Sequence, residues 1–223
     1  MYNLFEIELQ FREKVYGGLP KDEEALKAYV KAAFQSEDTS PTADDLDLQE
    51  ETDKRTVGFK KDDIGVYVGT YQLKAMLGEA ASLLEFTVKK RGSKQTFKEG
   101  LNIKGMNDDG DFTGEQCYFL PLKKEIDGTE MHTGNVSTPM GNRSIIKTLE
   151  FVEKPRLKFQ ISILENRMGE GNTKKLTVTD FKLCLAHARE LGLGSHRKYQ
   201  AGKFDIKSFK QLDSLSPEDV IDF

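Results

Sequence analysis

Residues 156–164 read RLKFQISIL, and apolar and polar side chains alternate from Arg156 to Ile163. A period of two predicts a β-strand with one buried face. Residues 145–152 form a second strand candidate, and Glu153-Lys154-Pro155 between the two is a turn signal. Two neighbouring strands joined by a short turn predict a β-hairpin.

Four elements flank this predicted hairpin: a strand at residues 5–12, helices at 70–84 and 177–191, and a strand at 203–209. The helices carry apolar side chains at helical spacing, behind threonines that can cap them. These caps are Thr70 for the first helix and Thr177 or Thr179 for the second. The order strand, helix, hairpin, helix, strand is the ferredoxin-like, RRM-like βαββαβ pattern of an α+β fold. Its helices cover one sheet face, and the other face is left free to bind a partner.

Two stretches interrupt this frame within a single predicted domain of 223 residues. Residues 14–63 hold a predicted helix at 22–34 and an acidic segment at 36–53, whereas residues 89–144 mix lysine and glycine with short apolar runs. The acidic segment carries a charge of −8, so the total of −4 leaves +4 for the rest of the chain. Local patches rather than the total charge decide whether phosphate is attracted.

Composition excludes several classes of protein. The chain has no signal-peptide pattern and no apolar run near the length of a membrane span, so we expect a cytoplasmic protein without a membrane segment. Two cysteines and three histidines lie too far apart in sequence for a zinc motif, and Asp108-Asp109-Gly110-Asp111 lacks the spacing of a calcium loop. We expect neither a metal nor a cofactor.

Residues 192–203 read GLGSHRKYQAGK and are the main candidate binding element. Glycines let backbone N–H groups approach a phosphate, and Arg197, Lys198 and Lys203 add cationic donors. His196 and Tyr199 can stack on bases. The ordinary alternative is a glycine that ends a helix at Gly192, followed by a basic surface loop.

Two motifs resemble the RAMP superfamily, the fold of CRISPR-associated RNA-binding subunits. Residues 192–194 match its Gly-apolar-Gly loop, and residues 202–206 (GKFDI) match the glycine, basic residue and apolar strand that follow. Residues 69–77 (GTYQLKAML) resemble its small or hydroxyl residues before Leu-Lys-x-x-Leu. The chain departs from the family pattern in having Gly69 for a proline, Gly78 for an arginine and Gln200 for a glycine.

Within that superfamily, the layout of the two insertions is most similar to the crRNA-binding backbone subunits of effector complexes. Those proteins insert a lid after the first strand and a thumb-like hairpin before the second strand. The resemblance implies a subunit that lines up along a single-stranded guide RNA in several copies, together with other effector-complex subunits. The predicted RNA-binding residues are Gly192, Gly194, Ser195, His196, Arg197, Lys198, Tyr199, Gly202, Lys203, Thr70, Gln72, Lys74 and Lys158. No catalytic residue is predicted.

Two other functions remain open. Some members of the superfamily are metal-independent endoribonucleases that use a histidine as general acid or base, for which His196 and His132 are candidates. Asp22 is a further candidate for RNA cleavage, through an acidic side chain instead of a histidine. An aspartate at this position also suits the start of a helix. The third function is a protein-interaction module that acts through residues 36–53. The lysine-rich residues 86–106, with a net charge of +5, fit either a solvated loop or a phosphate-tracking patch.

Overall fold

The computed structural model describes residues 2–20, 56–84, 101–138, 141–164, 177–197 and 200–212. The fold is α+β, with two helices and three mainly antiparallel sheets among these residues. The predicted helix at 22–34, the acidic segment at 36–53 and most of the lysine-rich stretch lie outside the described residues.

The central sheet has five strands in the order β13-β1-β12-β7-β8, with every neighbouring pair antiparallel. The strands span Tyr2–Phe11 (β1), Leu101–Met106 (β7), Phe112–Gly114 (β8), Arg156–Leu164 (β12) and Phe204–Gln211 (β13). The alternation that predicted β1 and β12 is confirmed. Phe5, Ile7 and Leu9 of β1 and Leu157, Phe159 and Ile161 of β12 are all at most 1% exposed.

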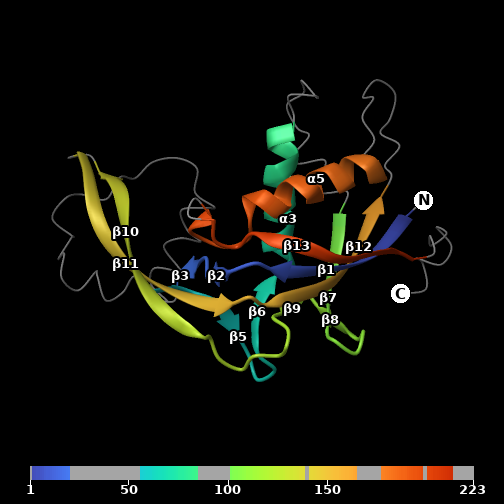
Figure 1. Ribbon diagram of the computed structural model, residues 1–223, viewed down its shortest axis with the longest axis horizontal. Coiled ribbons are helices and arrows are strands. Elements are labelled where there is room, and N and C mark those ends of the chain that lie inside the picture. The colour runs from blue at the N-terminus through green and yellow to red at the C-terminus, as the bar shows by residue number, and fades with distance from the viewer. Residues whose placement is uncertain are drawn as a thin grey trace, which may run out of the picture.

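Both helices lie on the same face of this sheet (Figure 1). Helix α3 spans Thr70–Leu83 and α5 spans Val178–Leu191. They follow β6 and β12 in the chain, and their buried residues join the main core around Phe5 and Phe159. Thr177 caps α5, because its hydroxyl accepts a hydrogen bond from the Asp180 N–H at 3.1 Å. The N-cap of α3 is Gly69 rather than the predicted Thr70, which is already the first helical residue and is buried.

A second sheet carries a long hairpin that extends away from the helices (Figure 1). Strand β10 pairs with β11 along its whole length, and β11 also pairs with β2 and β4. The strands span Lys14–Tyr16 (β2), Leu19–Pro20 (β3), Thr56–Gly58 (β4), Gly128–Thr138 (β10) and Gly141–Glu153 (β11). The third sheet consists of Lys60–Lys61 (β5), Val66–Gly69 (β6) and Gln116–Tyr118 (β9).

The predicted hairpin between residues 145–152 and 156–164 is wrong. The later segment, β12, pairs with β7 and β1, whereas the earlier one belongs to β11 and pairs with β10, β2 and β4. At Glu153–Pro155 the chain passes from one sheet to the other instead of folding back. Residues 11–13 also lead from the central sheet to the second sheet, and they run beside residues 153–155. The Phe11 N–H donates to the Pro155 carbonyl at 2.9 Å, and the Lys154 N–H donates to the Glu13 carbonyl at 3.1 Å.

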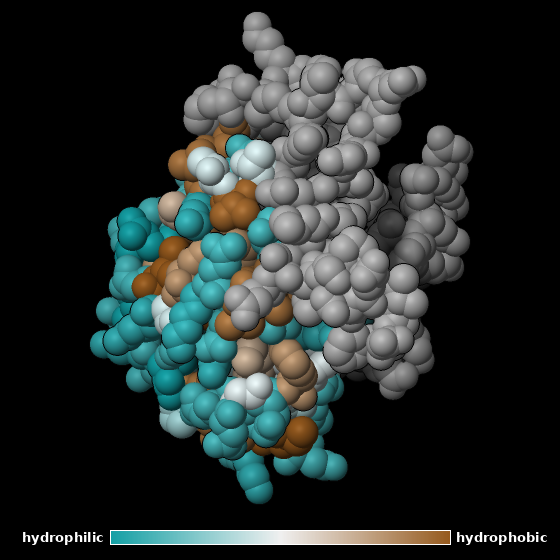
Figure 2. All heavy atoms as spheres, turned by 90° about the vertical axis from the view of Figure 1, so that its right-hand side faces the viewer, coloured by the Kyte–Doolittle hydropathy of each residue, from teal (hydrophilic) through white to brown (hydrophobic). Residues whose placement is uncertain are grey.

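No helix of the described residues is both long enough and apolar enough to cross a membrane. Figure 2 shows the end of the molecule on the right of Figure 1, where hydrophilic residues predominate and hydrophobic ones are scattered among them. Eight large hydrophobic residues of the described part are exposed, among them Tyr71 at 49% and Phe112 at 54%.

Candidate nucleic-acid interface

The glycine loop, residues 192–203, is fixed to β2 by its main chain. The Ser195 N–H donates to the Tyr16 carbonyl at 3.1 Å, and the Gly202 N–H donates to the Lys14 carbonyl at 2.9 Å. The loop also closes on itself, because the Leu193 N–H donates to the Gly202 carbonyl at 2.9 Å. Both described ends of the loop are therefore held against β2 of the second sheet.

Backbone packing accounts for the glycines of this loop. Gly194 and Gly202 have φ angles of 87° and 71°, which side chains disfavour. A Cβ at Gly194 would overlap the Tyr16 carbonyl, and one at Gly202 would overlap the Leu193 carbonyl. Since the amides of Leu193, Ser195 and Gly202 already donate to carbonyls, an approaching phosphate meets side chains rather than these N–H groups. Gly192 also ends α5, with its N–H bonded to the Ala188 carbonyl, as the ordinary alternative predicted.

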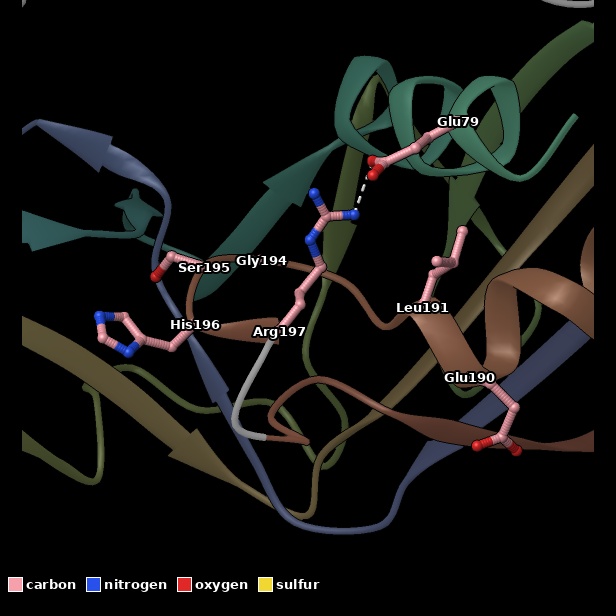
Figure 3. A pocket seen from close by; sticks show the side chains of 7 residues that line it. All are labelled: Glu79, Glu190, Leu191, Gly194, Ser195, His196 and Arg197. Carbon is pink, nitrogen blue, oxygen red and sulfur yellow. Dashed lines mark hydrogen bonds and ion pairs between the residues drawn. The ribbon is translucent and has the colours of Figure 1, made fainter. Parts of the chain in front are cut away.

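The side chains of the loop point in different directions (Figure 3). Arg197 reaches to Glu79 on α3, with 2.7 Å between its Nη1 and the carboxylate, while His196 points away from it. Ser195 lies between the two and donates its hydroxyl to the Gly17 carbonyl at 2.5 Å. A pocket of about 570 Å³ opens here, lined by Glu79, Glu190, Leu191, Gly194, Ser195, His196 and Arg197.

His196 meets His132 of β10, a contact that sequence spacing does not reveal. Their ring centroids are 4.3 Å apart with planes inclined at 43°, and the Tyr16 ring lies 5.1 Å from His132 and 6.0 Å from His196. His196 adopts a φ of 55°, an uncommon conformation for a residue other than glycine that the surrounding contacts must hold in place. Lys147 lies opposite His132 in the β10–β11 register. Burial, and then the nearby His132 and Lys147, lower the pKa of His196.

Glu130 organises the other side of this contact. Its carboxylate accepts a hydrogen bond from the Tyr16 hydroxyl at 2.5 Å, pairs with Lys14, and lies 3.4 Å from the Nε2 of His132. The hydrogen bonds from Lys14 and Tyr16 hold the pKa of Glu130 below its ordinary value. Burial raises the pKa of Tyr16 to about 12. We call Lys14, Tyr16, Glu130, His132 and His196 the histidine cluster.

The start of α3 lies next to the loop. Gln72 accepts the Gly69 N–H at 3.1 Å, and a Cβ at Gly18 would lie 4.0 Å from the Gln72 Nε2. Gly18 follows Gly17, whose carbonyl accepts the Ser195 hydroxyl. The turn at Gly17-Gly18 therefore joins the first turn of α3 to the glycine loop. Thr70 is buried and its N–H donates to the Glu115 carbonyl at 2.9 Å, so it supports the helix start from inside.

The remaining predicted residues are placed differently. Lys203 lies 3.5 Å from Glu190, and Lys74 is half-buried on α3. Lys158 is on the sheet face opposite the helices, where it pairs with Glu6 at 3.5 Å, and the structure does not bring it together with the loop. On the same face Arg156 pairs with Glu8 at 2.9 Å. Lys198 and Tyr199 lie outside the described residues.

Sequence reasoning missed Tyr16, Lys14 and Glu130, which surround the histidines, and Tyr71, which is exposed beside Gln72. Tyr16 directly precedes the Gly17-Gly18 break, and that position is the one signal that could have drawn attention to it. Among the residues that the structure describes, no group of three or more His, Cys, Asp and Glu is arranged to hold a metal ion.

Neither a protein-family model nor a curated protein matches this chain. Among solved structures, the chain is similar to a chain of the cryo-EM structure of the Type III-B Cmr-beta bound to cognate target RNA. The sequences are 12% identical, the match covers 96% of this chain and 62% of that one, and the TM-score is 0.45. This chain thus spans less than two thirds of the length of the chain it resembles.

Proposed function

We propose that this protein is a RAMP-type subunit that binds the backbone of a single-stranded, guide-like RNA and assembles along it in several copies within a CRISPR-type ribonucleoprotein. The strand order β13-β1-β12-β7 supports a ferredoxin-like core for it, with α3 between β1 and β7 in the chain and α5 between β12 and β13. The segments of the sequence that resemble RAMP proteins are the start of α3 and the glycine loop.

The observation that carries the proposal is the contact of these two segments through Gly17-Gly18. Ser195 bonds Gly17, and Gln72 lies beside Gly18, so residues far apart in the chain form one surface. Basic and aromatic side chains line it: Lys74 and Tyr71 at one end, and His196, His132 and Lys147 at the other. Cationic side chains along a track with aromatic rings are the means by which proteins hold single strands without reading their sequence.

Salt-dependent binding of single-stranded RNA tests the proposal. Wild type should bind with an affinity that falls as salt rises, and Lys147→Ala should weaken binding several-fold and reduce the salt slope by ~0.7, the value for one phosphate contact to a single strand. Lys182→Ala is the matched control, because Lys182 is an exposed lysine of α5 whose Nζ lies 5.3 Å from the Phe209 ring, on another part of the molecule. Wild type without affinity for RNA at low salt would refute the proposal.

The assembly of several protein copies along one RNA is tested separately from RNA binding, by the stoichiometry of the complex. If several chains line up on one RNA, the number of proteins bound per RNA should rise in steps as the RNA is lengthened, which mass measurement of the complexes reports. One protein per RNA at every length would contradict the assembly while leaving RNA binding intact.

The histidine pair favours metal-independent RNA cleavage as a second candidate function. In this scheme His196, whose pKa burial lowers, takes the proton from a ribose 2′-hydroxyl as the oxygen attacks the adjacent phosphorus. His132 gives a proton to the departing 5′-oxygen, so the products are a 2′,3′-cyclic phosphate and a 5′-hydroxyl. Incubation of a hairpin RNA with wild type, His196→Ala and His132→Ala decides: cleavage by wild type that both changes abolish supports it, and intact RNA rejects it.

A further inference from the structure

Tyr71, in the first turn of α3, presents an exposed aromatic ring at the surface proposed to bind RNA. The side chain is 49% exposed. Its ring lies across the backbone of Gly69, because a Cβ at Gly69 would overlap the Cε1 and Cδ1 atoms of Tyr71. Glycine at position 69 therefore lets the ring settle against the main chain, which holds one edge of it in place.

Lysines surround this ring. The Nζ of Lys60 in β5 lies 5.8 Å from its centroid, within the range of a cation–π interaction. Lys61 is exposed next to it, and Lys74 is one helical turn after Tyr71 on the same side of α3. The nearby Asp62 is engaged elsewhere: it accepts hydrogen bonds from the Tyr118 hydroxyl at 2.6 Å and from the Ile64 N–H at 2.9 Å. Lys60 and Lys74 are thus the cations beside the ring, and the carboxylates of Asp62 and Asp63 follow Lys61 in the chain.

Tyr71 is also linked to the glycine loop through its neighbour in the chain. Gln72, the next residue, reaches Gly18, and Gly17 before it accepts the Ser195 hydroxyl. A strand held by the loop and the histidine cluster that continued past Gly17-Gly18 would therefore reach Gln72, the residue next to Tyr71 in the first turn of α3. Each nucleobase offers a flat π-face, and stacking on an aromatic side chain is indifferent to base identity.

We infer that Tyr71 is a base-stacking residue: one nucleobase of the bound single-stranded RNA lies on the exposed face of its ring, with Lys60 and Lys74 beside the flanking phosphates. This inference rests on the proposed RNA binding and adds to it a subsite that neither the loop nor the histidine cluster supplies.

Four variants separate stacking from mere bulk. Tyr71→Ala and Tyr71→Leu remove the π-face and should weaken binding of a fluorescently labelled single-stranded RNA by about tenfold. Tyr71→Phe keeps the ring and should bind like wild type. Phe112→Ala is the matched control, since Phe112 is 54% exposed with the Lys104 Nζ 5.6 Å from its ring, but lies in β8, on the side of the molecule away from β2 (Figure 1).

The salt dependence gives a second readout. Because Tyr71 carries no charge, Tyr71→Leu should lower affinity without changing the salt slope, unlike Lys147→Ala. If Tyr71→Leu binds as tightly as wild type while Lys147→Ala binds weakly, the stacking inference is overturned and the proposed function stands. If wild type binds no RNA, both fall together. An RNA with 2-aminopurine at successive positions should show quenching at one position per protein that Tyr71→Leu relieves.

Discussion

Among the ion pairs that use cations predicted from the sequence to bind RNA, two differ clearly in burial. Arg197 and Glu79 join the glycine loop to α3 at 2.7 Å, with side chains 34% and 40% exposed. Lys158 and Glu6 face each other at 3.5 Å across β12 and β1, with side chains 16% and 18% exposed. An exposed pair gains little in water and exchanges partners at low cost, whereas a pair withdrawn from water loses more when one member is removed.

The difference teaches that burial, rather than the presence of a cation, decides how firmly a lysine or arginine is tied to its carboxylate. Glu6 also receives Lys210 at 3.8 Å, so the open face of the central sheet carries a network of mutually satisfied charges. At the loop, Arg197 can leave Glu79 for a phosphate without leaving a buried carboxylate behind. Substitutions at the loop and at the Lys158–Glu6 pair test this difference.

The largest effect is expected from Gly194→Ala, which disrupts the loop itself. Its φ of 87° and the overlap of a new Cβ with the Tyr16 carbonyl should together cost about 3 kcal/mol of unfolding free energy. Chemical denaturation measures it. Gly110→Ala is the control for the backbone angle alone, because Gly110 has a φ of 96° with nothing within 4 Å of its Cβ position; its cost should be about 1 kcal/mol. Equal costs would contradict the tight docking of the loop on β2.

Next in size is the contrast between Lys158→Met and Arg197→Met. Lys158→Met should lower the unfolding free energy by about 1–2 kcal/mol and leave RNA affinity unchanged, because Glu6 is left in a withdrawn site. Arg197→Met should change stability by less than about 1 kcal/mol and weaken RNA binding. Chemical denaturation measures the unfolding free energy of each variant, and RNA titration measures its affinity for RNA. The reverse pattern would mean that the open sheet face, and not the loop, contacts RNA.

A smaller effect is expected from Glu79→Gln, which keeps the shape of the side chain and removes its charge. Arg197 would then be released toward the phosphate, and RNA affinity should rise by about twofold to fivefold, most clearly at low salt. Glu125→Gln, which changes an exposed glutamate outside the pocket, serves as the control for net charge. Equal gains from both variants would show a general charge effect instead of a local release.

The smallest effect concerns pH and His196. Its pKa is lower in the folded protein than its ordinary value of 6.5, chiefly through burial. The unfolded chain therefore binds the proton more readily, so stability is full above pH 6.5 and declines as the pH falls from there toward the folded pKa. His196→Gln should flatten the decrease of the melting temperature across this range. An unchanged pH profile would remove His196 as its source.

Much of the frame follows from the sequence. Alternation at Phe5–Phe11 and at Leu157–Ile163 predicted β1 and β12, because each strand buries one face. Helical spacing behind Thr177 predicted α5 and its cap. Strand partners could not be inferred in this way, since residues 145–152 and 156–164 look alike although Glu153–Pro155 carries the chain into another sheet. The short β7 was hidden in a stretch read as an insertion, where Gly105 replaces an apolar side chain.

Only part of the candidate site could be predicted from the sequence, because some of its contacts depend on strand pairing. The glycine loop is local, so its motif located Ser195, His196 and Arg197. The contact of His196 with His132 depends on the register of β10 on β11 and on the docking of the loop on β2, which are properties of the whole fold. Gly17-Gly18 was interpreted as a break, yet Gly17 is required because a Cβ there would overlap Gly58. The spacing of residues in the sequence does not reveal such close contacts between backbone segments.

The passage of two neighbouring strands between sheets at Phe11–Glu13 and Glu153–Pro155 has an evolutionary consequence. The base of the β10–β11 hairpin is held by β2 and β4, which both pair with β11, so its tip can lengthen or shorten without disturbing the loop below. A one-residue insertion or deletion in β10 between Gly128 and His132, by contrast, would turn His132 to the opposite face and away from His196. The reach of the hairpin can therefore vary among descendants of this chain while its base stays constant.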